Sequence, residues 1–376
     1  MILKLLRFEK GKITSYFAFA KDESCGRYFS KKLIVATGDV RQIYKEKPST
    51  LLKINGIGTH VTNQLFAIEN KILAEKELEY IDQNNIITSY FLDDEYPKNL
   101  QQCIDAPILF FKDGNINLQN KRIISIVGTR NMTSYGSGFC KELIKELTAY
   151  NPIIVSGFAY GVDICEHKEA IKNELQTIAV LAHGFEQIYP KSHKKYMHQL
   201  NENGGFITEF WHDENPLREN FLKRNRIVAG ISQATIIIES AEKGGSLVTA
   251  DIANSYSRDV FAAPGRTTDL YSKGCNRLIK DNKAALLTSA EDVAKMLNWD
   301  LSSKQKKSKA IQKQLFVELN NDEQKVYDYL FKKGKQILDV IALDCDIPIY
   351  KLAPILLQLE MKGILKPLPG KLFEVV

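Results

Sequence analysis

The sequence lacks the features that would place the protein outside the cytoplasm. Its 376 residues include six cysteines, none of which forms a Cys-x-x-Cys pair. Scattered cysteines in a chain this long argue against a disulfide framework and fit a reducing compartment. No apolar run approaches the roughly 20 residues that a membrane-spanning helix needs. The charged start does not resemble a signal peptide. We therefore expect a cytoplasmic protein with no membrane segment.

Motifs for nucleotide hydrolysis and dinucleotide binding are also missing. Gly128 is not followed by the Gly-Lys-Ser/Thr of a Walker A loop, and Gly136 and Gly138 lie too late for a full Gly-x-Gly-x-x-Gly. His193 and His198 are five residues apart, so they do not share a helix face as paired metal ligands would. We expect neither a metal nor an organic cofactor.

A serine hydrolase is a further alternative that the sequence supports poorly. Ser156, Ser246 and His183 lie near predicted strand ends, but no Gly-x-Ser-x-Gly elbow occurs. Both serines flank glycines, where hydroxyls commonly bind a ligand or cap a helix. We expect a protein without a catalytic nucleophile.

Between residues 123 and 287 a pattern of strand, turn and helix repeats. β-Branched and other apolar runs predict strands there at 123–127, 153–155, 177–181, 206–208, 235–238, 260–262 and 284–287, and a short strand at 108–111 precedes them. Helical segments between them, among them 137–150, predict an α/β fold: a doubly wound, mostly parallel sheet with helices on both faces.

Glycine-rich loops follow at least three of these strands. They are Gly-Thr-Arg at 128–130, the segment 156–163 and Lys-Gly-Gly-Ser at 243–246. Ligands of such sheets bind beyond the carboxyl ends of the strands. A glycine loop that opens a helix also presents free N–H groups to an anion. We expect the three loops to line one anion-binding pocket.

A basic segment precedes the strand predicted at 235–238. Phe221 lies there among Arg218, Lys223, Arg224 and Arg226. The ring is either a core anchor or a platform on which a base stacks, the arrangement that single-strand binding uses. Arg224 and Arg226 either contact the ligand or are held inside the fold by Glu239 or Asp251.

The regions on either side of the sheet predict smaller domains. In residues 1–85, a Gly-Ile-Gly turn at 56–58 precedes a helix at 61–78, which is typical of a helix-hairpin-helix (SAM-like) domain. That turn either contacts a DNA phosphate or only joins two packed helices. Residues 86–300 form the predicted sheet domain.

The C-terminal part begins with a linker. Residues 301–314 are rich in lysine and contain no acidic residue, which predicts a flexible connection. Residues 315–376 predict three helices and a hairpin, a winged-helix-like domain. Its second and third helices are poor in Lys and Arg, so a protein contact is at least as good an interpretation as duplex DNA binding.

The ordered motifs resemble those of the DNA-processing protein A (DprA, also called Smf) family. They are Gly-Thr-Arg at 128–130, Ser-Gly-Phe-Ala-Tyr-Gly-Val-Asp at 156–163, His-Gly at 183–184, Tyr-Pro at 189–190, Phe at 221, Arg-Asn-Arg at 224–226, Lys-Gly-Gly-Ser at 243–246, Ala-Pro-Gly at 263–265 and Gly-x-Asn-x-Leu-Ile at 274–279. The resemblance spans about 90–290 and is specific as an ordered set.

The resemblance implies an extended Rossmann core that binds single-stranded DNA and dimerises. It also implies loading of the RecA recombinase onto incoming DNA during natural transformation, displacing or bypassing single-strand-binding protein. Family DNA contacts carry over to Arg130, Phe221 and Arg218. The candidate DNA-binding residues are Gly128, Thr129, Arg130, Ser156, Gly157, Arg218, Phe221, Arg224, Asn225, Arg226, Lys243, Gly244, Gly245, Ser246 and Asn276. Tyr160 and Gly244 depart from the family pattern, which more often has Arg and Ser there.

The leading hypothesis is therefore a non-enzymatic, single-strand DNA-binding recombination mediator. The alternative is an enzyme that hydrolyses a nucleotide or phosphoribosyl substrate on a related Rossmann-like sheet. Its usual Thr-x-x-Glu pattern is absent after Thr249. A third hypothesis makes residues 315–376 a docking module.

Overall fold

The computed structural model describes residues 19, 26–119, 122–299, 319–368 and 370–375. Contacts divide the chain into two compact units, Met1–Ser303 and Lys304–Val376. Each unit is described by itself below. The predicted linker at 301–314 lies outside the described residues.

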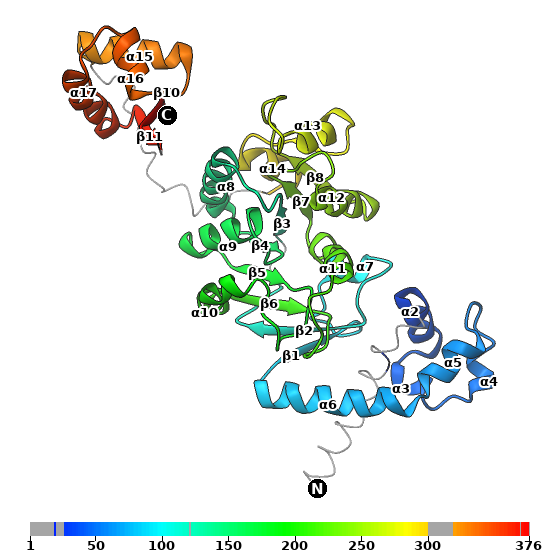
Figure 1. The fold of residues 1–376 in the computed structure, drawn as a ribbon. Helices are drawn as coiled ribbons and strands as arrows, with labels where there is room; N and C mark the ends of the chain where they lie inside the picture. Colours follow the sequence, from blue (N-terminus) through cyan, green and yellow to red (C-terminus); the bar gives the residue numbers. More distant parts are fainter. Residues whose placement is uncertain (1–18, 20–25, 120–121, 300–318, 369, 376) are drawn as a thin grey trace. The chain divides into compact units, whose positions relative to one another are not determined.

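The first unit is organised around a nine-stranded sheet with the order β1-β2-β6-β5-β4-β3-β7-β8-β9 (Figure 1). The strands are β1 Ile87–Tyr90, β2 Leu109–Gly114, β3 Ile123–Val127, β4 Ile153–Ser156, β5 Thr177–Val180, β6 Gly204–Thr208, β7 Ala234–Ile237, β8 Asp259–Ala262 and β9 Ala285–Leu286. Neighbours from β6 to β9 pair in parallel, whereas β1 and β2 are antiparallel. The α/β class and the mostly parallel sheet are as predicted.

Helices cover both faces of this sheet. They are α7 Lys98–Gln102, α8 Ser134–Leu147, α9 Val162–Lys172, α10 Met197–Glu202, α11 Arg218–Ile231, α12 Gly245–Ser255, α13 Lys273–Lys280 and α14 Ala290–Met296, with the 3-10 turns η2 Thr148–Tyr150 and η3 Lys191–Tyr196. Figure 1 shows α8 and α9 on one side of the sheet and α7, α11 and α12 on the other.

Alternate residues of β3 pack into the two apolar cores on opposite faces of the sheet. Ile124 and Ile126 belong to the core beneath α8, α9 and α14, while Ile123 and Val127 belong to the core beneath α7, α11, α12 and α13. Successive side chains of a strand point to opposite faces, so an apolar run without alternation is what a strand buried on both faces requires. This is why the β-branched runs located the central strands.

The helix predicted at 137–150 begins earlier and ends earlier than expected. α8 starts at Ser134, because Thr133 is its N-cap and its hydroxyl accepts a hydrogen bond from the Gly136 N–H at 3.2 Å. The β1 strand was not predicted. Its only fully buried residues are Ser89 and Tyr90, at the edge of the sheet, which leaves little apolar signal.

Five helices precede the sheet within the described part of the first unit. They are α2 Gly26–Thr37, α3 Val40–Ile43, α4 Pro48–Leu51, α5 Thr59–Leu65 and α6 Ile68–Asn84. The single helix predicted at 61–78 is wrong, because Ala67 has an extended conformation and separates α5 from α6. Ile57, in the Gly-Ile-Gly turn, is buried in a core that also contains Phe111 and Trp211 of the sheet domain. The predicted boundary at residue 85 thus separates a helical part from the sheet within one compact unit.

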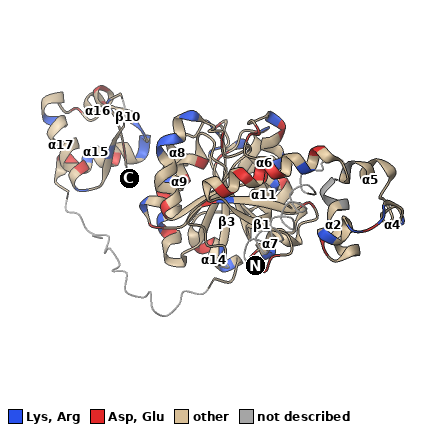
Figure 2. Ribbon diagram, turned by 90° about the horizontal axis from the view of Figure 1, so that it is seen from below, with Lys and Arg blue, Asp and Glu red and all other residues tan. Residues whose placement is uncertain are grey.

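Helix α6 presents an acidic surface rather than a basic one. Figure 2 shows red segments along α6, which has the sequence IENKILAEKELEYIDQN. Carboxylates repel a DNA backbone, so this helix is a poor candidate for DNA contact. The predicted DNA contact of the turn at 56–58 stays a prediction.

The second unit contains three helices and a small antiparallel sheet among its described residues. Its elements are α15 Asn321–Lys333, β10 Gln336–Ile337, α16 Leu338–Asp344, α17 Ile349–Met361, β11 Leu365–Leu368 and β12 Leu372–Val375, with the strand order β10-β12-β11. Leu352, Leu356 and Leu359 of α17 belong to its core. Three helices and a hairpin are present where the sequence predicted them; the winged-helix assignment stays a prediction. Across the described residues, no helix has the length and apolarity to cross a membrane.

Candidate functional site

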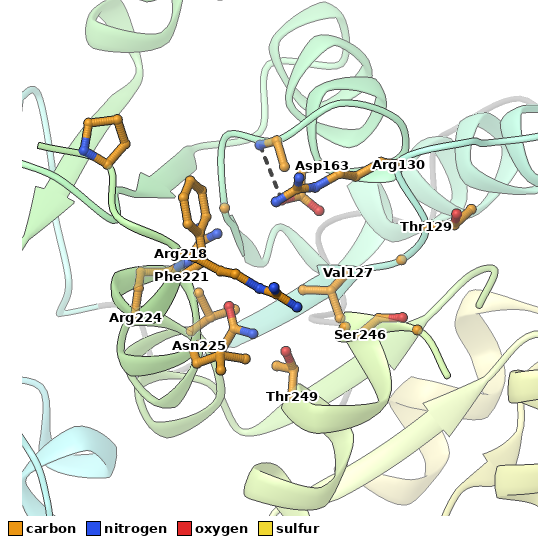
Figure 3. Close-up of a pocket in the computed structure, with 18 of the residues that line it drawn as sticks. Val127, Thr129, Arg130, Asp163, Arg218, Phe221, Arg224, Asn225, Ser246 and Thr249 are labelled. Carbon is orange, nitrogen blue, oxygen red and sulfur yellow. Dashed lines mark hydrogen bonds between the residues drawn. The ribbon is translucent and has the colours of Figure 1, made fainter. Parts of the chain in front are cut away.

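A pocket of about 600 Å³ lies beyond the carboxyl ends of β3, β4 and β7. The chain runs outward from β3 to β6 on one side and returns to β7 on the other. This is the point where strand order reverses, and open α/β sheets bind ligands there. In Figure 3, Phe221 and Asn225 approach the pocket from α11, Ser246 and Thr249 from α12, and Arg130 and Asp163 from across the cavity.

The loop after β3 is fixed by close backbone packing. The Thr129 N–H donates to the Glu239 carbonyl at 2.7 Å, and the Val162 N–H donates to the Thr129 carbonyl at 3.2 Å. A Cβ on Gly128 would lie 2.4 Å from the Val162 side chain. Gly161 has φ +78° and a Cβ there would be 2.2 Å from the Thr129 carbonyl. Only glycines permit this approach, which places Arg130 at the pocket.

Glu239 anchors the same loop from the end of β7. Its side chain is buried and accepts hydrogen bonds from the Thr133 N–H at 2.8 Å and the Thr133 hydroxyl at 2.5 Å. We expected this carboxylate as one possible partner of Arg224 or Arg226. It instead secures the start of α8, because a carboxylate satisfies donors at a helix N-terminus.

The loop after β4 rests on buried charges. A Cβ on Gly157 would lie 2.1 Å from Arg224 Nη1 and 2.4 Å from Asp163 Oδ2, so glycine is needed at this position. Asp163 Oδ2 also accepts from the Ala159 N–H at 3.3 Å. The Gly157 carbonyl accepts from His167 Nε2 at 2.7 Å. The pocket floor is therefore held from beneath by ionisable side chains.

His167 and Glu166 form a fully buried pair under this loop. His167 Nδ1 lies 3.0 Å from Glu166 Oε1. Burial raises the pKa of Glu166 to about 7, against the opposing charge of His167. Burial alone would lower the pKa of His167, but the Glu166 charge and the hydrogen bond to the Gly157 carbonyl raise it. The pair therefore retains protons that an exposed pair would lose.

Helix α11 sends the two arginines of its Arg-Asn-Arg motif in different directions. Arg224 is buried and Nη1 donates to the Val180 carbonyl at 2.6 Å, while its side chain still lines the pocket. Burial lowers the pKa of Arg224, and the charge of Asp163 opposes that effect. Arg226 is buried elsewhere, paired with Glu209. Of the two interpretations left open, Arg226 follows the structural one, with Glu209 as the carboxylate.

Phe221 belongs to an aromatic and cationic cluster at the pocket mouth. Its ring centroid lies 5.5 Å from that of Tyr189, with an interplanar angle of 69°. The Arg130 guanidinium carbon lies 5.5 Å from the Phe221 centroid. Phe221 is half-buried, so one part of the ring packs and another is open to a ligand. Tyr189 was not among the predicted site residues, although its Tyr-Pro pair is one of the ordered motifs.

The third wall is the start of α12. Gly244 is the N-cap, and in the described chain no side chain caps this helix. Its first N–H groups can therefore bind an anion. A Cβ on Gly244 would lie 2.2 Å from the Ser240 hydroxyl, which already accepts from Ser246 Oγ at 2.9 Å. The departure from serine at 244 thus fits the packing of this loop.

Eleven of the fifteen candidate residues line the pocket: Gly128, Thr129, Arg130, Gly157, Arg218, Phe221, Arg224, Asn225, Gly244, Gly245 and Ser246. Ser156 instead donates to the Ile126 carbonyl at 2.6 Å, and Arg226 pairs with Glu209 as described. Asn276 exchanges hydrogen bonds with the Gly265 backbone. Lys243 is not among the lining residues.

Further lining residues were not among the fifteen candidate DNA-binding residues. Ala159 and Asp163 belong to the segment 156–163, which was expected to line the pocket; the others are Val127, Tyr189, Pro216, Leu222, Val228, Ala241 and Thr249. Their positions depend on how the loops fold over the sheet, so strand and glycine patterns gave no signal for most of them.

The hydroxyls considered as nucleophiles already have protein acceptors. Ser156 donates to a strand carbonyl and Ser246 to Ser240. His183 Nδ1 donates to the Gly184 carbonyl at 2.8 Å. A catalytic triad needs a hydrogen bond between the nucleophile and its base. The hydrogen bonds described for Ser156, Ser246 and His183 join none of these residues to another. Among the residues that are described, no group of three or more His, Cys, Asp or Glu could hold a metal ion.

Comparison with known proteins places this chain in a family. The family model for DNA recombination-mediator protein A matches residues 87–298. The chain is 38% identical over 202 residues to the DNA processing protein DprA of Streptococcus pneumoniae, covering 54% of this chain and 71% of that protein. It is 32% identical over 282 residues to the protein Smf of Escherichia coli, covering 73% of this chain and 74% of that one.

Two solved structures share the fold. The crystal structure of DNA processing protein A from Streptococcus pneumoniae aligns with a TM-score of 0.66 and 29% identity, covering 77% of this chain and 99% of that one. The protein of the same name from Helicobacter pylori, whose structure addresses its single-stranded DNA binding mode, aligns with a TM-score of 0.51 and 28% identity, covering 57% and 95% of the two chains.

Proposed function

The chain belongs to the DNA recombination-mediator protein A family, and from this premise we propose that its pocket binds single-stranded DNA without cleaving it. The Helicobacter pylori relative is a single-stranded DNA-binding protein. The observation that carries the proposal is the cluster of Phe221, Tyr189 and Arg130 at the pocket mouth. An aromatic platform beside a cation is the combination that holds a base and its phosphate.

Three kinds of group in the pocket suit a nucleic-acid strand. Arg130 and Arg218 supply positive charge, and an arginine fork donates two hydrogen bonds to one phosphate. The uncapped start of α12 supplies backbone N–H groups. Phe221 and Leu222 supply apolar surface for a base. The cavity of about 600 Å³ is large enough for a nucleotide.

Binding in this pocket is tested by the fluorescence anisotropy of a labelled oligothymidylate over a salt series. Phe221→Ala should weaken binding about 5- to 150-fold, because stacking contributes roughly 1–3 kcal/mol per base. Phe331→Ala is the matched control, since Phe331 is an exposed phenylalanine of the second unit. Equal affinities for the wild type and Phe221→Ala would reject the pocket as the site.

We further propose the mediator role of the family for this chain: it forms a homodimer and loads RecA onto incoming DNA during natural transformation, in place of single-strand-binding protein. A strand coated with single-strand-binding protein resists RecA, and this chain should restore the DNA-dependent ATPase of RecA on it. Phe221→Ala should fail to do so, because a mediator must hold the strand. If the wild type and Phe221→Ala restore the RecA ATPase equally well, the mediator role does not depend on the pocket.

A second candidate role concerns the second unit, where we infer a protein-docking surface. Tyr350, Leu357 and Met361 lie along one face of α17 and are 74%, 57% and 82% exposed. The charged residues of α17 are Lys351 and Glu360, too few cations for a helix that enters a DNA groove. Leu357→Glu with Met361→Glu should abolish RecA stimulation and leave oligothymidylate affinity unchanged; a weaker DNA affinity would contradict the docking role.

A further inference from the structure

We propose that a second pocket, next to the first, binds a neighbouring segment of the same DNA strand, so that the strand crosses Tyr160 between two basic sites. This inference rests on the proposed single-strand binding. The second pocket has a cavity volume of about 460 Å³ and is formed by α8, α9 and η3. None of its lining residues belongs to the lining of the first pocket.

The second pocket carries a net positive charge. Lys141, Lys168 and Lys195 line it, each on a different element, α8, α9 and η3. One carboxylate, Glu169, also lines it and lies 3.8 Å from the ammonium group of Lys172. Figure 2 shows blue segments on both α8 and α9. Three lysines around one cavity, against a single carboxylate, favour a phosphate-bearing ligand.

An aromatic ring lies beside these lysines. The ammonium nitrogens of Lys195 and Lys168 lie 5.1 Å and 5.6 Å from the Tyr196 ring centroid. Tyr196 is half-buried and lines the cavity. The first pocket has the same combination, with Arg130 5.5 Å from Phe221. A base stacked on Tyr196 would leave its phosphate near the two ammonium groups.

The two pockets lie on either side of one ridge of chain. Along the loop after β3, Arg130 lines the first pocket and Met132 the second; after β4, Ala159 lines the first and Ile164 the second. Tyr160 lies between Ala159 and Ile164 in the sequence and is 46% exposed. A strand that leaves the first pocket at Arg130 therefore meets Tyr160 before it reaches the lysines.

Contacts hold Tyr160 against the second pocket. Its ring packs edge-on against His193, with centroids 4.9 Å apart and an interplanar angle of 75°. Its hydroxyl accepts a hydrogen bond from Ser192 Oγ at 3.3 Å. His193 is buried and donates from Nδ1 to the Phe158 carbonyl at 2.9 Å. Tyr160 thus presents a fixed aromatic surface on the path between the pockets.

The length of the bound strand provides the test. Full-length protein is titrated with labelled oligothymidylates from 4 to about 20 nucleotides at several salt concentrations. Lys168→Ala with Lys195→Ala should leave the affinity for the shortest strand unchanged and weaken the longest about tenfold or more. The slope of log affinity against log salt should fall by about 1.4 for the long strand, or about 0.7 for each phosphate that the variant no longer neutralises. Lys98→Ala with Lys280→Ala is the control, since these exposed lysines line neither pocket.

The outcomes separate this inference from the proposed function. If Phe221→Ala weakens binding at every length and the Lys168 and Lys195 variant matches the wild type, the second pocket is rejected and the first stands. An equally weakened affinity at all lengths in the lysine variant also rejects the second pocket, because it would indicate general charge attraction. If Phe221→Ala has no effect at any length, the proposed function fails first. Thermal melts check that each variant is folded.

Discussion

The guanidinium of Arg130 lies over the ring of Phe221, with its carbon 5.5 Å from the ring centroid. The two residues come from the loop after β3 and from α11, far apart in the sequence. Arg130 is oriented by glycine packing at 128 and 161, and Phe221 by the burial of α11 against the sheet. Arg130 and Phe221 are therefore held in place by different parts of the fold, so the contribution of each to binding can be tested separately.

Removing the guanidinium should have a different signature from removing the ring. Arg130→Ala should weaken binding of a long oligothymidylate and reduce its salt slope by about 0.7, because one phosphate is no longer neutralised. Phe221→Ala should weaken binding with an unchanged slope, because a phenyl ring carries no charge. Anisotropy titrations over a salt series distinguish the two. Arg277→Ala, on the exposed surface of α13, is the control. The same slope change in both pocket variants would contradict these separate roles.

Glycine at position 157 should be indispensable, whereas glycine at 138 should not. A Cβ at 157 would lie 2.1 Å from Arg224 Nη1, so Gly157→Ala should cost about 1–3 kcal/mol of folding stability and weaken DNA binding. Gly138, inside α8, has open space around its Cβ position, and Gly138→Ala should stabilise by up to about 1 kcal/mol. Urea unfolding of both variants checks the contrast. Equal changes in folding stability for the two variants would show that the residues around position 157 can shift to make room for a methyl group.

The Glu166–His167 pair should make folding stability fall as the pH rises. Both pKa values are raised in the folded chain, Glu166 to about 7. The native state therefore holds more protons than the unfolded chain, and stability present below about pH 4.5 is lost as the pH rises through 7 and beyond. For one proton the slope is at most about 1.4 kcal/mol per pH unit.

Glu166→Gln isolates this contribution. Glutamine resembles the protonated acid in shape, so the variant should remain folded while its stability curve loses most of the downward slope between about pH 5 and 8. Urea unfolding at several pH values measures the difference from the wild type, which removes the contributions of other histidines. Parallel curves for the two proteins would show that the pair titrates as it does in the unfolded chain.

Cys165 should report occupation of the second pocket. Its thiol lines that cavity, and hydrogen bonding to Cys140 lowers the pKa of Cys165, against the opposing effect of burial. Iodoacetamide at neutral pH should therefore alkylate Cys165 ahead of Cys103 and Cys275, which are buried. An oligothymidylate long enough to span both pockets should protect it and the shortest one should not. Peptide mass spectrometry gives the extent of alkylation; equal alkylation with and without the long strand would place the strand elsewhere.

The sheet was predictable because its signal is local. The run Ile123–Val127 is buried at every position, as burial on both faces demands, and a glycine loop follows it. The topology then brings the glycine loops to one edge. Strand β1 escaped prediction, because its polar Thr88 and Ser89 resemble a loop.

The site was predictable as a set of residues but not as a set of roles. Sequence could not tell that Arg224 supports the pocket floor while Arg226 pairs with Glu209, since the partners, Val180 at the end of β5 and Glu209 just after β6, come from other parts of the fold. Tyr196 gave no signal of a role, and Tyr189 stood out only as part of an ordered motif, because the role of each depends on a cation or ring that folding brings beside it. Long-range side-chain pairing is the information that periodicity and spacing do not contain.

The central claim is that single-stranded DNA lies in the pocket beside Phe221. Photocrosslinking with an oligothymidylate that carries 5-iodouracil, followed by mass spectrometry of the crosslinked peptides, tests it most directly. We expect crosslinks at Phe221 or Tyr189, which should disappear when a large excess of unlabelled strand competes. Crosslinks found only in residues 26–84 or in 319–375, with none in the pocket, would contradict the account.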